Sequence, residues 1–94
     1  MIIRIVKLQL KPDYTALFCQ KFDEINHQIT AMPGCEGVSL LRDINNPSLF
    51  FTKSYWQTQA DLEAYRNSDF FNLTWSLVKP FFAARAEAWS LQEV

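Results

Sequence analysis

The chain has 94 residues, with nine Lys plus Arg against ten Asp plus Glu, and a formal net charge of −1. This length suits a single domain, residues 1–94, with one core. Hydrophobic residues make up 49% and aromatic residues 15% of the chain, which is enough for a core without metal or disulfide cross-links. The positive charges are scattered, which argues against nucleic acid as a partner.

Export and membrane insertion are not expected. No apolar run approaches the roughly 18 residues that span a bilayer, and the N-terminal residues 1–4 lack the pattern of a signal peptide. We therefore expect a cytoplasmic protein with no membrane partner. In that compartment Cys19 and Cys35 stay reduced, and we interpret both as packing residues.

No cluster of His, Asp and Glu with metal-ligand spacing occurs in the sequence, so we expect no metal. The one histidine, His27, falls toward the end of a predicted helix, and we interpret it as a solvated or capping residue.

The first third of the chain predicts a strand and then a long helix. Residues 2–10 are β-branched and apolar and stop at Lys11-Pro12-Asp13, which is typical of a strand before a helix start. From Asp13 to Met32 apolar residues recur at spacings of three and four, which predicts one amphipathic helix ended by Pro33-Gly34. These apolar residues are Phe18, Phe22, Ile25, Ile29 and Met32.

A β-hairpin is predicted next. Residues 35–44 and 49–56 carry strand-forming residues on both sides of the turn cluster Asn45-Asn46-Pro47-Ser48. Trp56 closes the second strand of this hairpin.

The last third predicts two helical stretches and a final strand. Thr58 and Asp61 have the spacing of a capping box, so a helix begins at Thr58. The helix is interrupted at residues 67–69, where Ser68 caps a further helix that ends ahead of Pro80. Residues 81–94 alternate alanine with larger residues, which favours a strand.

The element order is therefore β-α-β-β-α-α-β, an α+β fold of the ferredoxin-like, split βαβ kind. Right-handed crossovers place the helices on one face of a four-stranded antiparallel sheet. The other face stays bare, although the strands are apolar on both sides, as Ile3 and Ile5 against Val6 and Leu8 illustrate. Because such a face is costly to expose, we expect a homodimer packed sheet against sheet.

Charged residues are also expected on the covered face, where they either pair across the dimer and reach its rim or form a polar site inside the barrel. These residues are Lys7, Lys53, Arg85 and Glu87.

The stretch from Trp56 to Phe71 resembles the signature of the antibiotic biosynthesis monooxygenase superfamily, the dimeric α/β-barrel group. In that group a strand ending in Trp runs into a Thr- or Ser-capped helix and then a Ser-Asp-x-Phe joint, matched by Ser68–Phe71. Pro33-Gly34 matches the family's stop before the second strand. The resemblance in element order spans the chain and implies the fold more specifically than any chemistry.

The family includes haem-degrading monooxygenases, and the resemblance implies where their site residues would fall. Those members use an Asn on the first strand, a Trp on the second helix and a His as iron ligand. The matched positions of this chain hold Val6, Tyr65 and Trp75. Since Trp75 offers no lone pair to an iron, we expect no haem and no other cofactor.

Other family members oxidise phenols without metal or flavin, which asks mainly for an apolar, water-poor pocket. We predict such a pocket between the helices and the sheet. Tyr65 is the predicted catalytic hydrogen-bond donor and Trp75 the stacking wall. The predicted substrate-binding residues are Phe22, Phe71, Val6 and Leu8.

Two functions stay open at this point. One is a cofactor-independent monooxygenase acting on an aromatic or polyketide-like small molecule. The other is a non-catalytic dimeric module that binds an apolar ligand or a partner, or has a stress-related role. The same aromatic residues would also suit a filled core, and fold alone does not decide between the functions.

Overall fold

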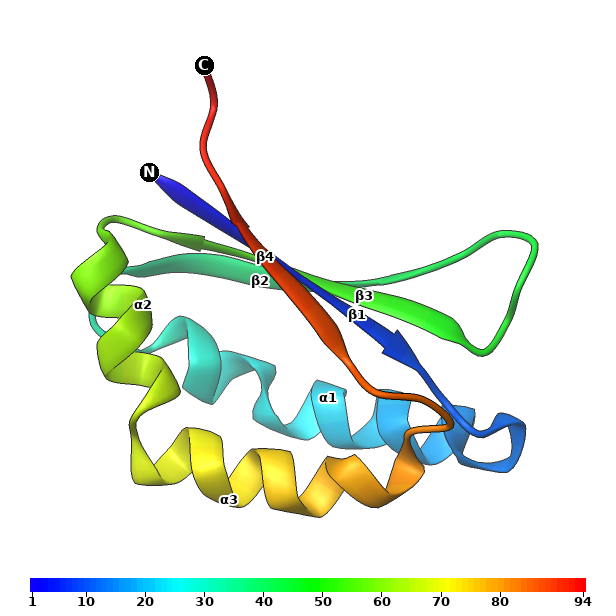
Figure 1. The fold of residues 1–94 in the computed structure, drawn as a ribbon. Helices are drawn as coiled ribbons and strands as arrows, with labels where there is room; N and C mark the ends of the chain where they lie inside the picture. Colours follow the sequence, from blue (N-terminus) through cyan, green and yellow to red (C-terminus); the bar gives the residue numbers. More distant parts are fainter.

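The computed structural model describes residues 1–94 and has the expected order of strands and helices, with a single antiparallel sheet ordered β2-β3-β1-β4. The strands are β1 (Ile2–Gln9), β2 (Cys35–Arg42), β3 (Leu49–Trp56) and β4 (Glu87–Leu91), and the helices are α1 (Thr15–Thr30), α2 (Gln59–Arg66) and α3 (Asp69–Val78). All three helices lie on one side of the sheet (Figure 1). The prediction of an α+β, ferredoxin-like fold is confirmed.

Helix α1 is slightly shorter than the predicted span of residues 13–32. A single 3-10 turn, Pro12–Tyr14, comes first, because the proline fixes the backbone and the Thr15 hydroxyl donates to the Pro12 carbonyl oxygen at 3.2 Å. After the helix, Gly34 adopts a φ of 81°, where a Cβ would also collide with the Asp61 carboxylate. None of the helices has the length and apolar character needed to cross a bilayer.

Both predicted helix caps are present. The Thr58 hydroxyl accepts a hydrogen bond from the Asp61 amide at 3.1 Å, and the Ser68 hydroxyl accepts one from the Phe71 amide at 3.1 Å. Each cap satisfies an amide that a helix start otherwise leaves free. The Thr58 cap fixes the start of α2, and the Ser68 cap fixes the break between α2 and α3 at residues 67 and 68.

The final strand is much shorter than the predicted span of residues 81–94. Phe82 pairs with Leu10 in an isolated bridge, and the Ala83 amide donates to the Gln9 carbonyl oxygen at 2.8 Å. The chain then leaves the sheet and rejoins it only at Glu87. The alternating alanines suggested a longer strand because alternation does not reveal this excursion, and Arg85 consequently lies outside the sheet.

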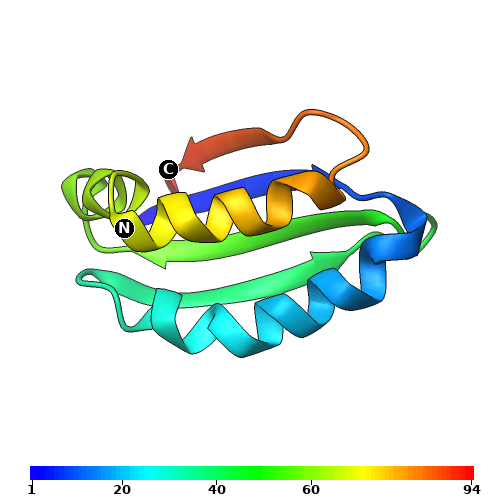
Figure 2. The same cartoon turned by 90° about the horizontal axis from the view of Figure 1, so that it is seen from below.

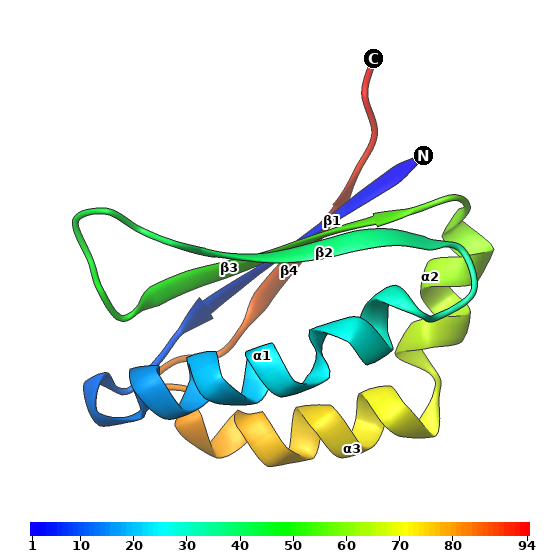
Figure 3. The ribbon, with the colours of Figure 1, turned by 180° about the vertical axis from the view of Figure 1, so that it is seen from behind.

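The hairpin prediction holds for its second strand, whereas the first strand ends at Arg42 and not at residue 44. Asp43 ends it, because its carboxylate accepts hydrogen bonds from the amides of Asn45 and Asn46 at 2.7 and 2.9 Å. The resulting loop extends beyond the sheet at the end opposite to the two termini (Figure 3).

Two clusters of buried side chains pack between the sheet and the helices. One consists of Leu8, Leu10, Phe18, Phe50 and Val78 and the other of Ile29, Trp56 and Leu62. Cys19 packs against the first cluster and Cys35 against the second, as expected for packing residues. Helices α1 and α3 run side by side beneath the sheet (Figure 2), and α2 stands at one end of it.

The opposite face of the sheet has no covering element (Figure 1). The strand register places Ile3 beside Tyr55 and Leu91, and Ile5 beside Lys53 and Trp89. Leu41, Trp89 and Leu91 are 47%, 42% and 49% exposed. We call this surface the open face; it consists of Ile3, Ile5, Lys7, Leu41, Phe51, Lys53, Tyr55, Glu87, Trp89 and Leu91.

Candidate functional site

A cavity of about 360 Å³ lies between the sheet and helices α1 and α3. Members of both buried clusters line it, so both halves of the core border the cavity. Its volume falls in the lower part of the range of small-molecule sites, roughly 300–1,000 Å³. All six residues that the sequence singled out line this cavity, namely Val6, Leu8, Phe22, Tyr65, Phe71 and Trp75. Their catalytic and substrate-binding roles stay predictions.

Aromatic rings form a continuous row from Trp56 to Phe82, and its three middle members, Tyr65, Phe71 and Trp75, form a wall along one side of the cavity. Tyr65 on α2 stacks on Trp56 with a centroid distance of 4.9 Å and meets the edge-on ring of Phe71 at 5.2 Å. Phe71 stacks on Trp75 at 5.9 Å, and Trp75 meets Phe82 at 5.3 Å. The wall is possible because the Ser68 cap turns the chain so that α2 and α3 present their rings to the same space.

Two polar hydrogens of this wall have no partner within the chain. Neither the Tyr65 hydroxyl nor the Trp75 indole N–H takes part in an intramolecular hydrogen bond, whereas the Trp56 indole donates to the Ser54 hydroxyl at 2.9 Å. No fully buried side-chain polar atom is left without a partner. The free hydroxyl and the free N–H are therefore accessible from the cavity or the solvent, as a ligand-binding wall requires.

Burial raises the pKa of Tyr65 to about 12, and the neighbouring Cys35 contributes to the rise. The phenol therefore stays protonated at neutral pH and acts there as a hydrogen-bond donor, not as a base. Burial likewise raises the pKa of the Cys35 thiol, which opposes formation of a reactive thiolate.

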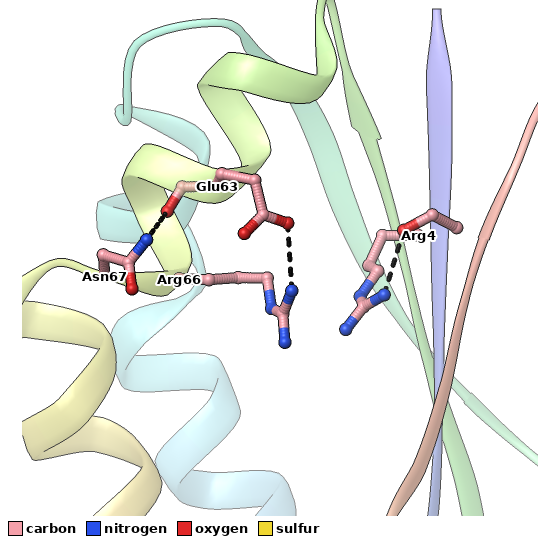
Figure 4. A network of polar contacts seen from close by, with 5 residues as sticks. Arg4, Glu63, Arg66 and Asn67 are labelled. Atoms are coloured by element: carbon pink, nitrogen blue, oxygen red, sulfur yellow. Dashed lines mark hydrogen bonds and ion pairs between the residues drawn. The ribbon is translucent and has the colours of Figure 1, made fainter.

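Sequence reasoning missed the polar residues of the cavity, above all Arg4 and Arg66. Arg4 lies on β1 in the same row as Val6 and Leu8, and Arg66 ends α2; both line the cavity. Figure 4 shows the two guanidinium groups reaching toward each other from the sheet and the helix. A single charge in an otherwise apolar strand row was the signal available in the sequence.

The lining of the cavity does not fit a haem iron. It contains no His, Cys, Met, Asp or Glu, and its only phenol is that of Tyr65, whose raised pKa disfavours the tyrosinate that iron would need. His27 is exposed on α1 and does not line the cavity. No group of three or more His, Cys, Asp or Glu residues is arranged to hold a metal ion.

Comparison with protein families identifies a match to the family described as "Antibiotic biosynthesis monooxygenase", over residues 1–73. Two archaeal proteins named as putative heme-binding proteins are also similar. The one from Halobacterium salinarum is 33% identical over 66 residues and the one from Haloarcula marismortui 34% over 65. These matches cover 70% and 69% of this chain but span only 13% and 10% of the two archaeal proteins.

Solved structures match over nearly the full chain. One named as a putative antibiotic biosynthesis monooxygenase from Bordetella bronchiseptica has a TM-score of 0.89 and 26% identity, and covers 99% of this chain and 96% of its own. A second of the same description, from Nitrosomonas europaea, has a TM-score of 0.90 and 19% identity over 100% and 99% of the two chains. At that lower identity the likeness concerns the fold alone.

Proposed function

Because the chain belongs to the antibiotic biosynthesis monooxygenase family, we propose that it is a cofactor-independent monooxygenase acting on an aromatic or polyketide-like small molecule. The observation that carries this proposal is the cavity, with its aromatic wall and its two free polar hydrogens. Tyr65 donates a hydrogen bond to an oxygen of the substrate, and Trp75 stacks against its ring. Phe22, Phe71, Val6 and Leu8 enclose the apolar body.

The reaction that suits such a site is the oxidation of a phenol to a quinone by molecular oxygen. One oxygen atom replaces hydrogen on the ring carbon and becomes a carbonyl group, and the other leaves as water with the two displaced hydrogens. The substrate supplies all four electrons, so the balance needs no further reductant. The protein contributes a dry cavity and a fixed orientation.

The cavity lining supplies no carboxylate or imidazole that could act as a base. The substrate must therefore enter as its own anion or lose its proton to water, and the Tyr65 hydroxyl stabilises negative charge on its oxygen. The rate should accordingly fall at low pH, below the pKa of the substrate's own hydroxyl group.

The two archaeal relatives named as putative heme-binding proteins raise haem as an alternative ligand. The donor set of the cavity argues against haem, since no axial ligand of the usual kinds lines it. We expect no tight binding of haemin; a sharp Soret shift with one-to-one binding on titration would contradict this expectation.

Oxygen uptake with a panel of dihydroxy-aromatic and anthrone-type compounds tests the proposed activity. We expect uptake with at least one compound, and a loss on the order of a hundredfold in kcat for Tyr65→Phe, the effect of removing one well-placed donor. Tyr14→Phe is the matched control, because Tyr14 is 40% exposed and lies outside the cavity lining. Ligand binding without oxygen uptake by the wild type would favour the non-catalytic binding module.

We also propose that two copies of the chain pack their open faces together. All four strands contribute large apolar side chains to this face, which suits packing against an identical surface, and Lys53 already packs over the Tyr55 ring at 5.3 Å. Lys7 lies opposite Glu87 in the register, so these two charges can pair within one subunit.

Replacing Trp89 with Glu would place a charge on the covered face and should raise the dimer dissociation constant by at least about tenfold. Leu77→Glu is the matched control, because Leu77 is 66% exposed on α3, on the helix side of the molecule. Sedimentation equilibrium measures both variants. A stable wild-type monomer at micromolar concentration, or equal weakening by both substitutions, would refute this mode of association.

Two further proposals concern the domain organisation and the cellular location. We propose that residues 1–94 behave as one domain and that the protein works in the cytoplasm. A single cooperative unfolding transition and recovery in the cytosolic fraction of cells would support them; two transitions or recovery elsewhere would contradict them.

A further inference from the structure

Arg4 interrupts the apolar row of β1 that faces the helices. Ser54 on β3 and Ser90 on β4 are its neighbours in the register, and its guanidinium donates to the Ser90 hydroxyl at 2.9 Å. Arg4 is only partly exposed and forms no ion pair with a carboxylate. A partly buried cation without a counter-ion is unfavourable, so its position in the cavity wall calls for an explanation.

Arg66 brings a second positive charge to the same place. Its guanidinium pairs with Glu63 at 3.0 Å, and its side chain is 40% exposed, so the pair lies at the edge of the cavity (Figure 4). Burial and the charge of Arg66 lower the pKa of Arg4, while Glu63 partly offsets them. Glu63 is the one carboxylate that acts on both cations, and it pairs only with Arg66, so this rim of the cavity carries an excess positive charge.

We propose that Arg4 and Arg66 bind the carboxylate of an aromatic acid whose ring system occupies the cavity. The inference rests on the proposed function, because it names the substrate class for the same site. A guanidinium group matches a carboxylate in planar, two-point geometry, and an anion between the two arginines would relieve their mutual repulsion. The apolar wall and the cationic rim therefore select for one amphipathic molecule, not for a neutral hydrocarbon.

A purely structural role for Arg4 makes different predictions. If the guanidinium served only to join β1 to β4 through Ser90, its removal would weaken folding and reduce the affinity for every ligand alike. A carboxylate-binding role requires the loss to depend on the charge of the ligand. Two ligands that differ in charge and little else separate these roles.

The experiment uses 2-naphthoate and its neutral analogue 2-naphthamide, titrated into the protein by isothermal calorimetry. For the wild type we expect 2-naphthoate to bind about tenfold more tightly than 2-naphthamide, as a charge-assisted hydrogen bond in a partly desolvated site provides. Arg4→Gln and Arg66→Gln should each remove most of this preference and leave the affinity for 2-naphthamide within about twofold. Arg42→Gln is the control, because Arg42 is exposed on β2 and does not line the cavity.

Thermal melting shows whether each variant is folded. If Arg4→Gln fails to fold, Arg66→Gln still tests carboxylate binding, because the Arg66 side chain is more exposed. Equal affinity of the wild type for the two ligands, equal losses for both in the arginine variants, or no binding of either would overturn the inference. Selective binding of 2-naphthoate without oxygen uptake by any phenol would support the inference while refuting the monooxygenase activity. Oxygen uptake by a phenol, together with equal affinity for 2-naphthoate and 2-naphthamide, would support the monooxygenase activity and refute the inference.

Discussion

The two faces of the sheet are both apolar, but they differ in the size of their side chains. The face toward the helices includes small or polar residues between its large ones, such as Thr52, Ser54 and Ala88, and these leave the space that becomes the cavity. The open face presents large residues at neighbouring positions, including Phe51, Tyr55 and Trp89. The comparison teaches that small side chains on an apolar surface leave room for a small ligand, whereas large side chains fill the surface and suit another sheet.

The largest expected effect comes from replacing one tryptophan on each face of the sheet. Trp56 is fully buried, stacks on Tyr65 and donates to Ser54, so Trp56→Ala should cost about 3–5 kcal/mol of unfolding free energy. Trp89→Ala should cost the separated subunit about 1 kcal/mol and mainly weaken its dimer. Urea denaturation at several protein concentrations measures both. Equal costs in the separated subunit would mean that the two faces are equally packed.

The second test uses the ionisation of Tyr65, which lies on α2 on the helix side of the sheet. Its pKa is raised from 10 to about 12, so the folded state holds this proton more tightly than the unfolded state does. The contribution of Tyr65 to stability is therefore fully present below pH 10 and is lost as the pH rises toward 12. Tyr65→Phe should lose stability less steeply over that window. Parallel stability curves for the two proteins would contradict the desolvation of this phenol.

The smallest effect concerns the joint between α2 and α3, which positions the aromatic wall on the helix side of the sheet. Ser68→Ala removes the cap of α3 and should cost about 1 kcal/mol of unfolding free energy. Ser76→Ala is the matched control, because the Ser76 hydroxyl only donates to the Asn72 carbonyl oxygen on an exposed turn, and its loss should stay within about 0.5 kcal/mol. Denaturant midpoints at constant slope measure both variants. A Ser76→Ala cost as large as that of Ser68→Ala would remove the special role of the cap.

The fold could be predicted because its local signals agree with one another. The spacing of Phe18, Phe22 and Ile25 predicts α1, and the side chains of Thr58 and Ser68 mark where α2 and α3 begin. The last strand was harder to predict. The chain leaves the sheet between Phe82 and Glu87, and this depends on pairing with β1, which is distant in sequence. Local strand propensity does not predict such a long-range contact.

The apolar part of the candidate site was predictable and its charged part was not. Helical spacing and the family resemblance brought Tyr65, Phe71 and Trp75 to one place, and the structure brings the same residues to the cavity. Arg4 and Arg66 are 62 positions apart, and only the stacking of α2 against the end of the sheet brings them together. Their proximity is a property of the tertiary structure that neither local sequence pattern contains.

The three tryptophans lie in three different environments, so their fluorescence should differ. Trp56 lies in the core with its indole bonded to Ser54, Trp75 borders the cavity, and Trp89 lies on the open face. Intrinsic fluorescence can therefore report folding, ligand entry and subunit association from one unlabelled sample, once single Trp→Phe variants assign each band. A quencher dissolved in the solvent should reach Trp89 in the free subunit and lose that access as two subunits come together.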